Sequence, residues 1–142
     1  MRNVRQLLES KPAEVFSISP DAAVIDAIRL MAQKGIGALL VMEGPRLSGI
    51  VSERDYARKV VLEGRSSKET QVREIMSDNV TSVAPDDTCE RCMALITALR
   101  IRHLPVMQDG GVVGILSIGD LVKAVIEDQQ VQLEQMERYI AG

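Results

Sequence analysis

The sequence is poor in aromatic residues and cysteine. Of its 142 residues, 2% are aromatic (Phe16, Tyr56 and Tyr139), and tryptophan is absent. A surface that stacks single-stranded nucleic acid needs several exposed aromatic side chains, so the composition argues against that class of protein. The chain has two cysteines, which provide no disulfide framework.

A basic excess and a long apolar run are also missing. The formal net charge is −3, whereas nucleic-acid-binding surfaces normally carry a strong positive excess. No run of about eighteen apolar residues could span a membrane, and residues 1–9 lack the apolar core of a signal peptide. We therefore expect a cytoplasmic protein that binds neither nucleic acid nor membrane.

The remaining composition is that of an ordinary globular protein. Hydrophobic residues make up 46% of the chain and charged residues 26%. This length can bury a real core, either in one domain or in two small subdomains that share it.

An internal repeat is the strongest feature of the sequence. Shifted by 65 residues, the segment 15–60 aligns with 80–125 without a gap. Residues 4–8 also match 72–76, if three residues are inserted in the first copy. Glycine, serine and aspartate recur at the fixed offset, in the pairs Gly49 and Gly114, Ser52 and Ser117, and Asp55 and Asp120. Such a period indicates two copies of one structural unit.

Each copy predicts the order β-α-β-β-α. In the first copy these elements cover residues 15–18, 24–34, 38–42, 47–51 and 52 to about 63. Gly35 is expected to end the first of these helices. Residues 124–140 predict a further helix, which could pack on its own core or on a second subunit.

One copy alone is too thin to bury its apolar face, so we expect an α/β (α+β) fold. Its two β-α-β-β-α repeats would pack about a pseudo-two-fold axis, with a C-terminal helix. The predicted parts are repeat one with its N-terminal segment (1–63), a polar connector (64–71), repeat two (72–126) and a C-terminal helical tail (127–142).

The duplicated motif carries a family resemblance. Residues 49–55 and 114–120 share the form G-h-h-S-x-x-D, where h is apolar. Occurring twice, each time at the end of a β-α-β-β-α unit, this motif resembles the cystathionine-β-synthase (CBS) domain. Residues 102–106 also resemble the second-strand segment of that family. The resemblance covers about residues 4–126, and the chain is similar to stand-alone bacterial proteins that consist of a CBS pair.

The resemblance implies a nucleotide site. CBS pairs bind AMP, ATP and, in some members, NAD or S-adenosylmethionine in clefts between the copies. The motif aspartate holds the ribose diol, with the serine beside it. The residues implied for the first cleft are Ile50, Ser52, Arg54, Asp55, Thr81, Ser82, Arg102, His103 and Pro105. Those implied for the second cleft are Phe16, Ser17, Ile36, Gly37, Ala38, Ile115, Ser117 and Asp120.

The chemistry of these residues agrees with that role. A carboxylate accepts two hydrogen bonds from vicinal hydroxyls, and such charge-assisted bonds are strong. Phosphate needs cations, and Arg54 belongs to the first motif, whereas Gly119 stands at that position in the second. We therefore expect unequal sites, with phosphate held better beside Asp55. The ligand expected is AMP or ATP, with NAD as a further option, and no catalytic cofactor, catalytic residue or metal ligand is expected.

Each of these features also has a purely structural interpretation. Ser-x-x-Asp is a helix capping box worth about 1 kcal/mol, and capping can coexist with ligand binding. Cys89 and Cys92 form C-x-x-C, but their counterparts Val24 and Ala27 lie on an apolar helix face, which favours buried cysteines over a metal or redox site. His103 could contact phosphate or sit at a strand edge, and both options remain open.

These observations predict a regulatory, ligand-sensing module in signal transduction. It would be a homodimer acting on a regulated protein that the sequence does not identify. The chain shows no Walker loop, no dinucleotide fingerprint and no nucleophile paired with a base, so we expect no enzyme activity. The alternative is a structural protein-interaction module with no small-molecule ligand.

Overall fold

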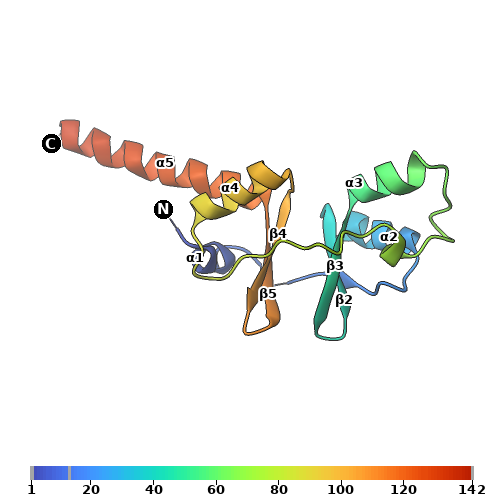
Figure 1. Cartoon of the computed structure of the whole chain (residues 1–142). Coiled ribbons are helices and arrows are strands. Elements are labelled where there is room, and N and C mark those ends of the chain that lie inside the picture. Colours follow the sequence, from blue (N-terminus) through green and yellow to red (C-terminus); the bar gives the residue numbers. More distant parts are fainter. Residues whose placement is uncertain (1, 13, 142) are drawn as a thin grey trace. The chain divides into compact units, whose positions relative to one another are not determined.

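The computed structural model describes residues 2–12 and 14–141, which form two compact units (Figure 1). Unit 1 contains residues 2–12, 82–108 and 113–141. Unit 2 contains residues 14–81 and 109–112. Each unit has its own hydrophobic core, and the mixture of small sheets and helices confirms the α+β class.

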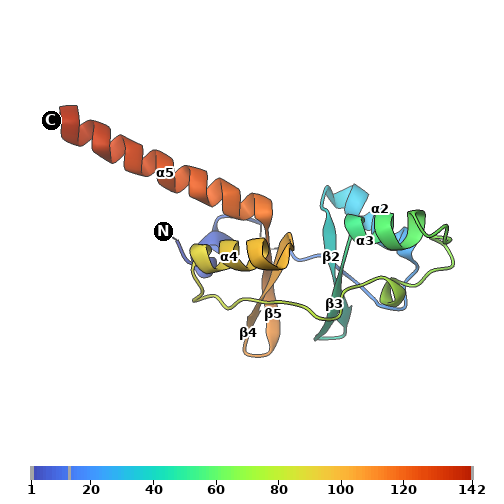
Figure 2. The ribbon, with the colours of Figure 1, turned by 45° about the horizontal axis from the view of Figure 1, so that its top comes forward.

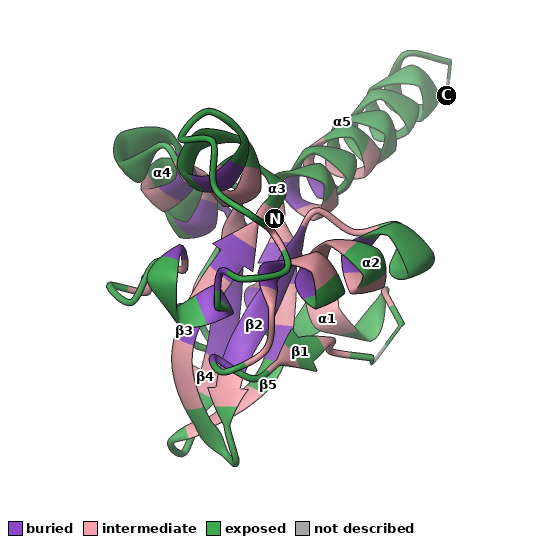
Figure 3. Cartoon of the chain, turned by 90° about the vertical axis from the view of Figure 1, so that its right-hand side faces the viewer, coloured by how far each residue is buried: buried purple, intermediate pink, exposed green. Residues whose placement is uncertain are grey.

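Unit 2 follows the predicted β-α-β-β-α order. Its elements are β1 (Ser17–Ile18), α2 (Val24–Lys34), β2 (Ala38–Glu43), β3 (Arg46–Ser52) and α3 (Glu53–Tyr56). The strand order is β1-β2-β3, with β1 parallel to β2 and β2 antiparallel to β3. The sheet packs its buried residues, among them Leu39 and Val51, against Met31 of α2. Figure 3 shows this buried surface on β2.

Unit 1 repeats most of this order. Its elements are α1 (Val4–Glu9), α4 (Cys89–Leu99), β4 (His103–Gln108), β5 (Gly111–Ser117, with its first two residues counted in unit 2) and α5 (Ile118–Ala141). The strand expected near residues 80–83 is reduced to a single parallel bridge between Val83 and Val106. In unit 2 the backbone N–H of Leu40 donates to the carbonyl of Phe16 at 3.3 Å. Pro105 stands at the equivalent position in unit 1 and has no N–H, so that ladder bond cannot form.

The helix predicted over residues 52–63 is also modified. After α3 the chain continues as a π-helix, Ala57–Val61 (η1), and the backbone N–H of Leu62 donates to the carbonyl of Ala57 at 3.0 Å. In unit 1 the corresponding helix begins at Ile118 and runs on as the 24-residue α5, so the helix expected at residues 124–140 is its continuation. No helix in the described part of the chain is long and apolar enough to cross a membrane.

The segment preceding each repeat packs on the core of the other repeat. Helix α1 places Val4 and Leu7 in the core of unit 1, beside residues of the second copy. The 3₁₀-helix Val72–Glu74 (η2) and the residue after it place Val72 and Ile75 in the core of unit 2. The compact units and the sequence repeats therefore have different boundaries.

This exchange explains the glycine that opens each G-h-h-S-x-x-D motif. A Cβ on Gly49 would lie 2.6 Å from the backbone carbonyl oxygen of Ser77. A Cβ on Gly114 would lie 2.6 Å from a methyl carbon of Leu8. Both glycines lie on the second hairpin strand, where the preceding segment of the other copy crosses closely. The Ser77 backbone leaves no room for a side chain at Gly49, whereas a side chain at Gly114 would require Leu8 to move.

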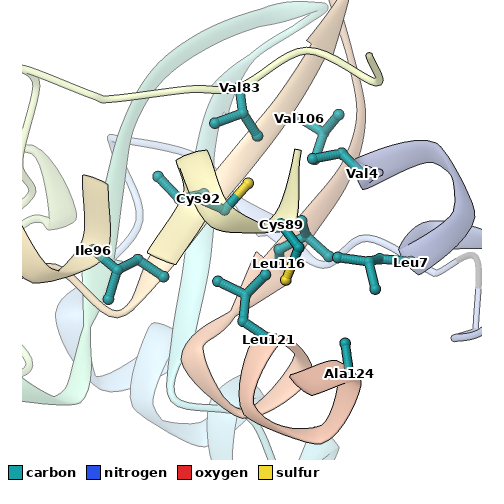
Figure 4. Close-up of a cluster of buried hydrophobic side chains, with 11 residues drawn as sticks. Val4, Leu7, Val83, Cys89, Cys92, Ile96, Val106, Leu116, Leu121 and Ala124 are labelled. Atoms are coloured by element: carbon teal, nitrogen blue, oxygen red, sulfur yellow. The ribbon is translucent and has the colours of Figure 1, made fainter. Parts of the chain in front are cut away.

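The C-x-x-C pair belongs to the core of unit 1. Cys89 and Cys92 are both fully buried on α4 and contribute to the cluster that also contains Leu116 and Leu121 (Figure 4). Burial raises the pKa of both thiols, that of Cys92 to about 11. The interpretation of these cysteines as buried core residues is confirmed.

Candidate functional site

The first motif forms a capping box at the start of α3. The Ser52 hydroxyl oxygen accepts a hydrogen bond from the backbone N–H of Asp55 at 3.2 Å. In return, Oδ2 of Asp55 accepts from the Ser52 backbone N–H at 2.9 Å and from the Ser52 hydroxyl at 3.0 Å. The serine and aspartate therefore hold each other in a fixed geometry at the end of β3.

The second motif repeats this geometry at the end of β5. The backbone N–H of Asp120 donates to the Ser117 hydroxyl at 3.1 Å, and the backbone N–H of Ser117 donates to Asp120 Oδ2 at 2.8 Å. The predicted capping role is thus confirmed for both motifs.

A further backbone bond is shared by the two motifs. In unit 2 the N–H of Glu53 donates to the carbonyl of Gly37 at 3.0 Å. In unit 1 the N–H of Ile118 donates to the carbonyl of Arg102 at 2.8 Å. Each motif is therefore tied to the residue that precedes the first hairpin strand. This bond brings Gly37 and Arg102 of the predicted set to the motif of their own unit.

The two carboxylates differ in their cationic neighbours. The ammonium of Lys11 donates to Asp120 Oδ2 at 2.8 Å and to the carbonyl of Ile115 at 2.8 Å. In unit 2, Lys59 Nζ lies 3.4 Å from Asp55 Oδ1 and donates to the carbonyl of Ile75 at 2.9 Å. Asp120 therefore forms a direct ion pair with a lysine from another segment, whereas Asp55 has a longer contact along its own helix.

This ion pair sets the charge state of Asp120. Burial raises the pKa of the carboxyl group, but the hydrogen bonds from Lys11 and from the Ser117 backbone, with the positive charge of Lys11, outweigh it. The net result is a pKa below the ordinary aspartate value, so Asp120 is ionised at neutral pH. Its side chain is 29% exposed and that of Asp55 is 20% exposed.

The predicted residues of unit 2 line the start and end of its hairpin. Ala38 pairs with Ser52 in the sheet, and Ile50 forms a backbone pair with Ser77. Arg54 is exposed on α3. Of the other predicted residues of unit 2, Phe16 and Ser17 lie beside and on β1. Ile36 precedes β2, and Thr81 lies where the main segment of the unit ends.

The predicted residues of unit 1 lie at the start of β4 and along β5. His103 begins β4 and is half-buried. Burial lowers its pKa below the ordinary histidine value, with Arg102 and Lys11 acting in the same direction and Asp120 opposing them. Ser82, Pro105 and Ile115 complete the predicted set in this unit. That one ligand contacts residues of both units stays a prediction.

Sequence reasoning missed Lys11. Lys11 lies between the preceding segment (residues 4–8) and the first strand of the first copy. This stretch is three residues longer than its counterpart in the second copy. The insertion was visible as a break in the repeat. That break did not indicate which carboxylate a lysine at this position would meet, because the segment folds onto the other copy.

A CBS domain family model matches residues 4–62 and 72–127. The chain belongs to the CBS domain family and carries two CBS domains in tandem. The CBS domain pair is a regulatory module.

Similar proteins support this assignment. A CBS-domain-containing protein of Arabidopsis thaliana, the mitochondrial CBSX3, is 43% identical over 127 residues, which cover 86% of this chain and 62% of that protein. A structure of a protein with CBS domains from Burkholderia ambifaria MC40-6 superposes with a TM-score of 0.88 at 53% identity, over 90% of this chain and 96% of that chain.

The CBS domain pair of protein MJ0100 has the same fold. Its structure, in complex with 5′-methylthioadenosine and S-adenosyl-L-methionine, superposes with a TM-score of 0.78 at 23% identity. The match covers 89% of this chain and 98% of that chain.

Proposed function

We propose that this chain is a ligand-sensing module whose two motif aspartates each hold the ribose of an adenosine nucleotide. AMP and ATP are the ligands proposed first, and NAD and S-adenosylmethionine share the same adenosine group. The observation that carries the proposal is the duplicated pairing of Ser52 with Asp55 and of Ser117 with Asp120, each at the same place in its unit. The module would catalyse no reaction.

Helix capping leaves each aspartate able to bind a diol. A carboxylate has two oxygens and about four lone-pair positions. In Asp55 the capping bonds all go to Oδ2, and Oδ1 lies 3.4 Å from Lys59 Nζ. A carboxylate already fixed by its own backbone loses little further freedom when a ligand binds, which favours affinity.

The adenosine class is supported by relatives of the same fold. The CBS pair of MJ0100 was solved with two adenosine-containing ligands. A carboxylate that accepts both ribose hydroxyls would recognise this shared group and leave the phosphate or sulfonium end to other residues. We further propose that the module works in the cytoplasm as a homodimer and that a regulated protein responds to its ligand state.

A thermal-shift screen tests the proposal. AMP, ATP, ADP, NAD and S-adenosylmethionine are each added to the full chain, because a ligand that binds only the folded state raises Tm. At least one of them should raise Tm. The same nucleotide lacking its 2′-hydroxyl should raise it far less, since the vicinal diol is then gone.

The matched variant is Asp55→Asn combined with Asp120→Asn. The side-chain oxygen of asparagine can still accept the hydrogen bond from the Ser52 or Ser117 backbone N–H. The fold should therefore persist while the charge-assisted ribose bonds are lost. The ligand-induced shift should disappear in this variant. If no ligand raises Tm, or if the 2′-deoxy nucleotide acts equally, the alternative of a structural protein-interaction module is favoured instead.

A further inference from the structure

Helix α5 presents an apolar surface that its own unit does not cover. Leu121 and Ala124 are its buried residues, and every residue from 129 to 141 is exposed. Figures 1 and 2 both show α5 projecting beyond α1 and α4 of the same unit. An isolated helical segment of this length is only marginally stable in water, so a packing partner would stabilise it.

The exposed residues follow a coiled-coil pattern. Positions separated alternately by four and three residues form one stripe along the helix, made up of Val122, Ile126, Gln129, Leu133, Met136 and Ile140. Leu133 is 58% exposed and Ile140 is 79% exposed. An apolar repeat of 3.5 residues is the signature of two helices that supercoil around each other. We call these six residues the α5 seam.

The α5 seam is complementary to itself when two copies run in opposite directions. With the pair centred on Val131, Val122 would face Ile140 of the partner subunit, and Ile126 would face Met136 of the partner subunit. Gln129 would face Leu133 of the partner subunit. The apolar residues thus meet apolar residues towards both ends, and the glutamines gather at the centre.

The flanking charges distinguish the antiparallel from the parallel arrangement. Residues just beside the stripe meet their counterparts across the interface and set helix orientation. In the antiparallel pair, Lys123 would lie opposite Glu137 of the partner subunit, and this contact would occur twice. In the parallel pair, Glu137 would lie opposite Gln132 of the partner subunit, and no opposite charges would meet.

Lys123 is available for such a contact. Its side chain is 75% exposed, and its ammonium lies 4.0 Å from Glu127 on the same helix, at the limit of an ion pair. We propose that the α5 helices of two copies of this chain pair as an antiparallel coiled coil through the α5 seam, centred on Val131. The proposal rests on the exposed face of α5 and on no property of the nucleotide sites.

Site-directed disulfide formation tests both the partner and the direction. Two full-length variants, Ile126→Cys and Met136→Cys, are prepared. Each variant alone and a mixture of the two are then treated with glutathione disulfide. The native Cys89 and Cys92 are fully buried and serve as the unreactive background. A disulfide needs Cα atoms within about 7 Å. The mixture should therefore form a covalent dimer, and each variant alone should not.

Matched controls lie on the same helix. Adding Leu133→Asp to both cysteine variants should reduce the yield of covalent dimer at least about tenfold, because a charge would enter the seam. Adding Val131→Asp should leave the yield within about twofold, since Val131 is 52% exposed and lies off the seam. Both positions are exposed, so neither change should unfold the chain. Dimers formed by a single variant, or no dimer in the mixture, would overturn the proposal.

Discussion

At the scale of residues, one motif acquires two electrostatic environments. Asp55 and Asp120 occupy equivalent positions, each bonded to the serine that caps its helix. Only Asp120 forms an ion pair with Lys11, because the N-terminal segment packs on the second copy. The residue itself is therefore predictable from the repeat, and its charge environment is not.

The ion pair predicts a pH-dependent contribution to stability. An unfolded aspartate has a pKa of about 3.9, and that of Asp120 is lowered in the folded chain. Its stabilising contribution is thus present above about pH 4 and is lost as the pH falls through the folded pKa. Without ligand, Asp120→Asn should lower the free energy of unfolding by about 1 kcal/mol at pH 7. The effect is this small because both side chains are partly exposed and solvent screens the ion pair.

Denaturant unfolding of both proteins across pH 2–7 measures this difference. The difference in the free energy of unfolding between wild type and Asp120→Asn should shrink towards zero at the lowest pH, because the wild-type carboxyl group is then neutral as well. Lys11→Met is the matched variant and should show a loss of similar size at pH 7. A gap that stays constant with pH would contradict the assignment.

Helix ends show a second residue-level difference. Gly35 ends α2 with φ +64°, and Arg100 ends α4 with φ +54° at the equivalent position. The left-handed region suits glycine and costs other residues about 1 kcal/mol. Arg100→Gly should therefore raise the free energy of unfolding by about 0.5–1 kcal/mol, and Gly35→Ala should lower it by about 1 kcal/mol. Chemical denaturation of both variants checks the opposite signs, and a destabilised Arg100→Gly would refute the argument.

At the scale of elements, the order of strands and helices was largely predictable. Alternation and helical spacing placed α2 and the β2–β3 hairpin correctly. Two departures from the predicted elements occur, and Pro105 is the local cause of the first. Pro105 removes the N–H that the short first strand of the second copy would need, and the helix after Asp55 changes to a π-helix.

The exchange of the preceding segments is an element-level feature with a testable consequence. Leu7 is buried in unit 1, and Ile75 is buried in unit 2. Replacing a buried Leu or Ile by Ala typically costs about 2–5 kcal/mol. Leu7→Ala should therefore reduce amide protection mainly in α4, β4 and β5, and Ile75→Ala mainly in β2 and β3.

Hydrogen–deuterium exchange of the two variants measures this pattern. Each variant is the control for the other, because both remove a fully or nearly fully buried aliphatic side chain. If Leu7→Ala weakened protection chiefly in β2 and β3, the N-terminal segment would belong to the first copy after all.

At the scale of the whole molecule, the proposed function and the duplication together predict two ligand sites of unequal strength. A ribose approaching Asp120 must compete with Lys11 for the same carboxylate, whereas the Asp55 carboxylate has the longer contact with Lys59. Arg54 adds a cation only to the first motif. Titration calorimetry with AMP should therefore show a tighter and a weaker site.

Single variants assign the two sites. Asp55→Asn should weaken the tighter site by at least about tenfold, which corresponds to about 1.4 kcal/mol. Asp120→Asn should leave that site within about twofold. If Asp120→Asn abolished the tighter site instead, the Lys11 argument would be reversed.

The sequence by itself determined the repeat, the α+β class, the capping motifs and the burial of Cys89 and Cys92. These features depend on periodicity and on interactions within a few residues, which a linear pattern records. Only the tertiary structure decided which copy each preceding segment packs against, and with it the contact between Lys11 and Asp120. The two copies offer similar apolar faces to those segments, so the choice depends on three-dimensional packing that no local pattern encodes.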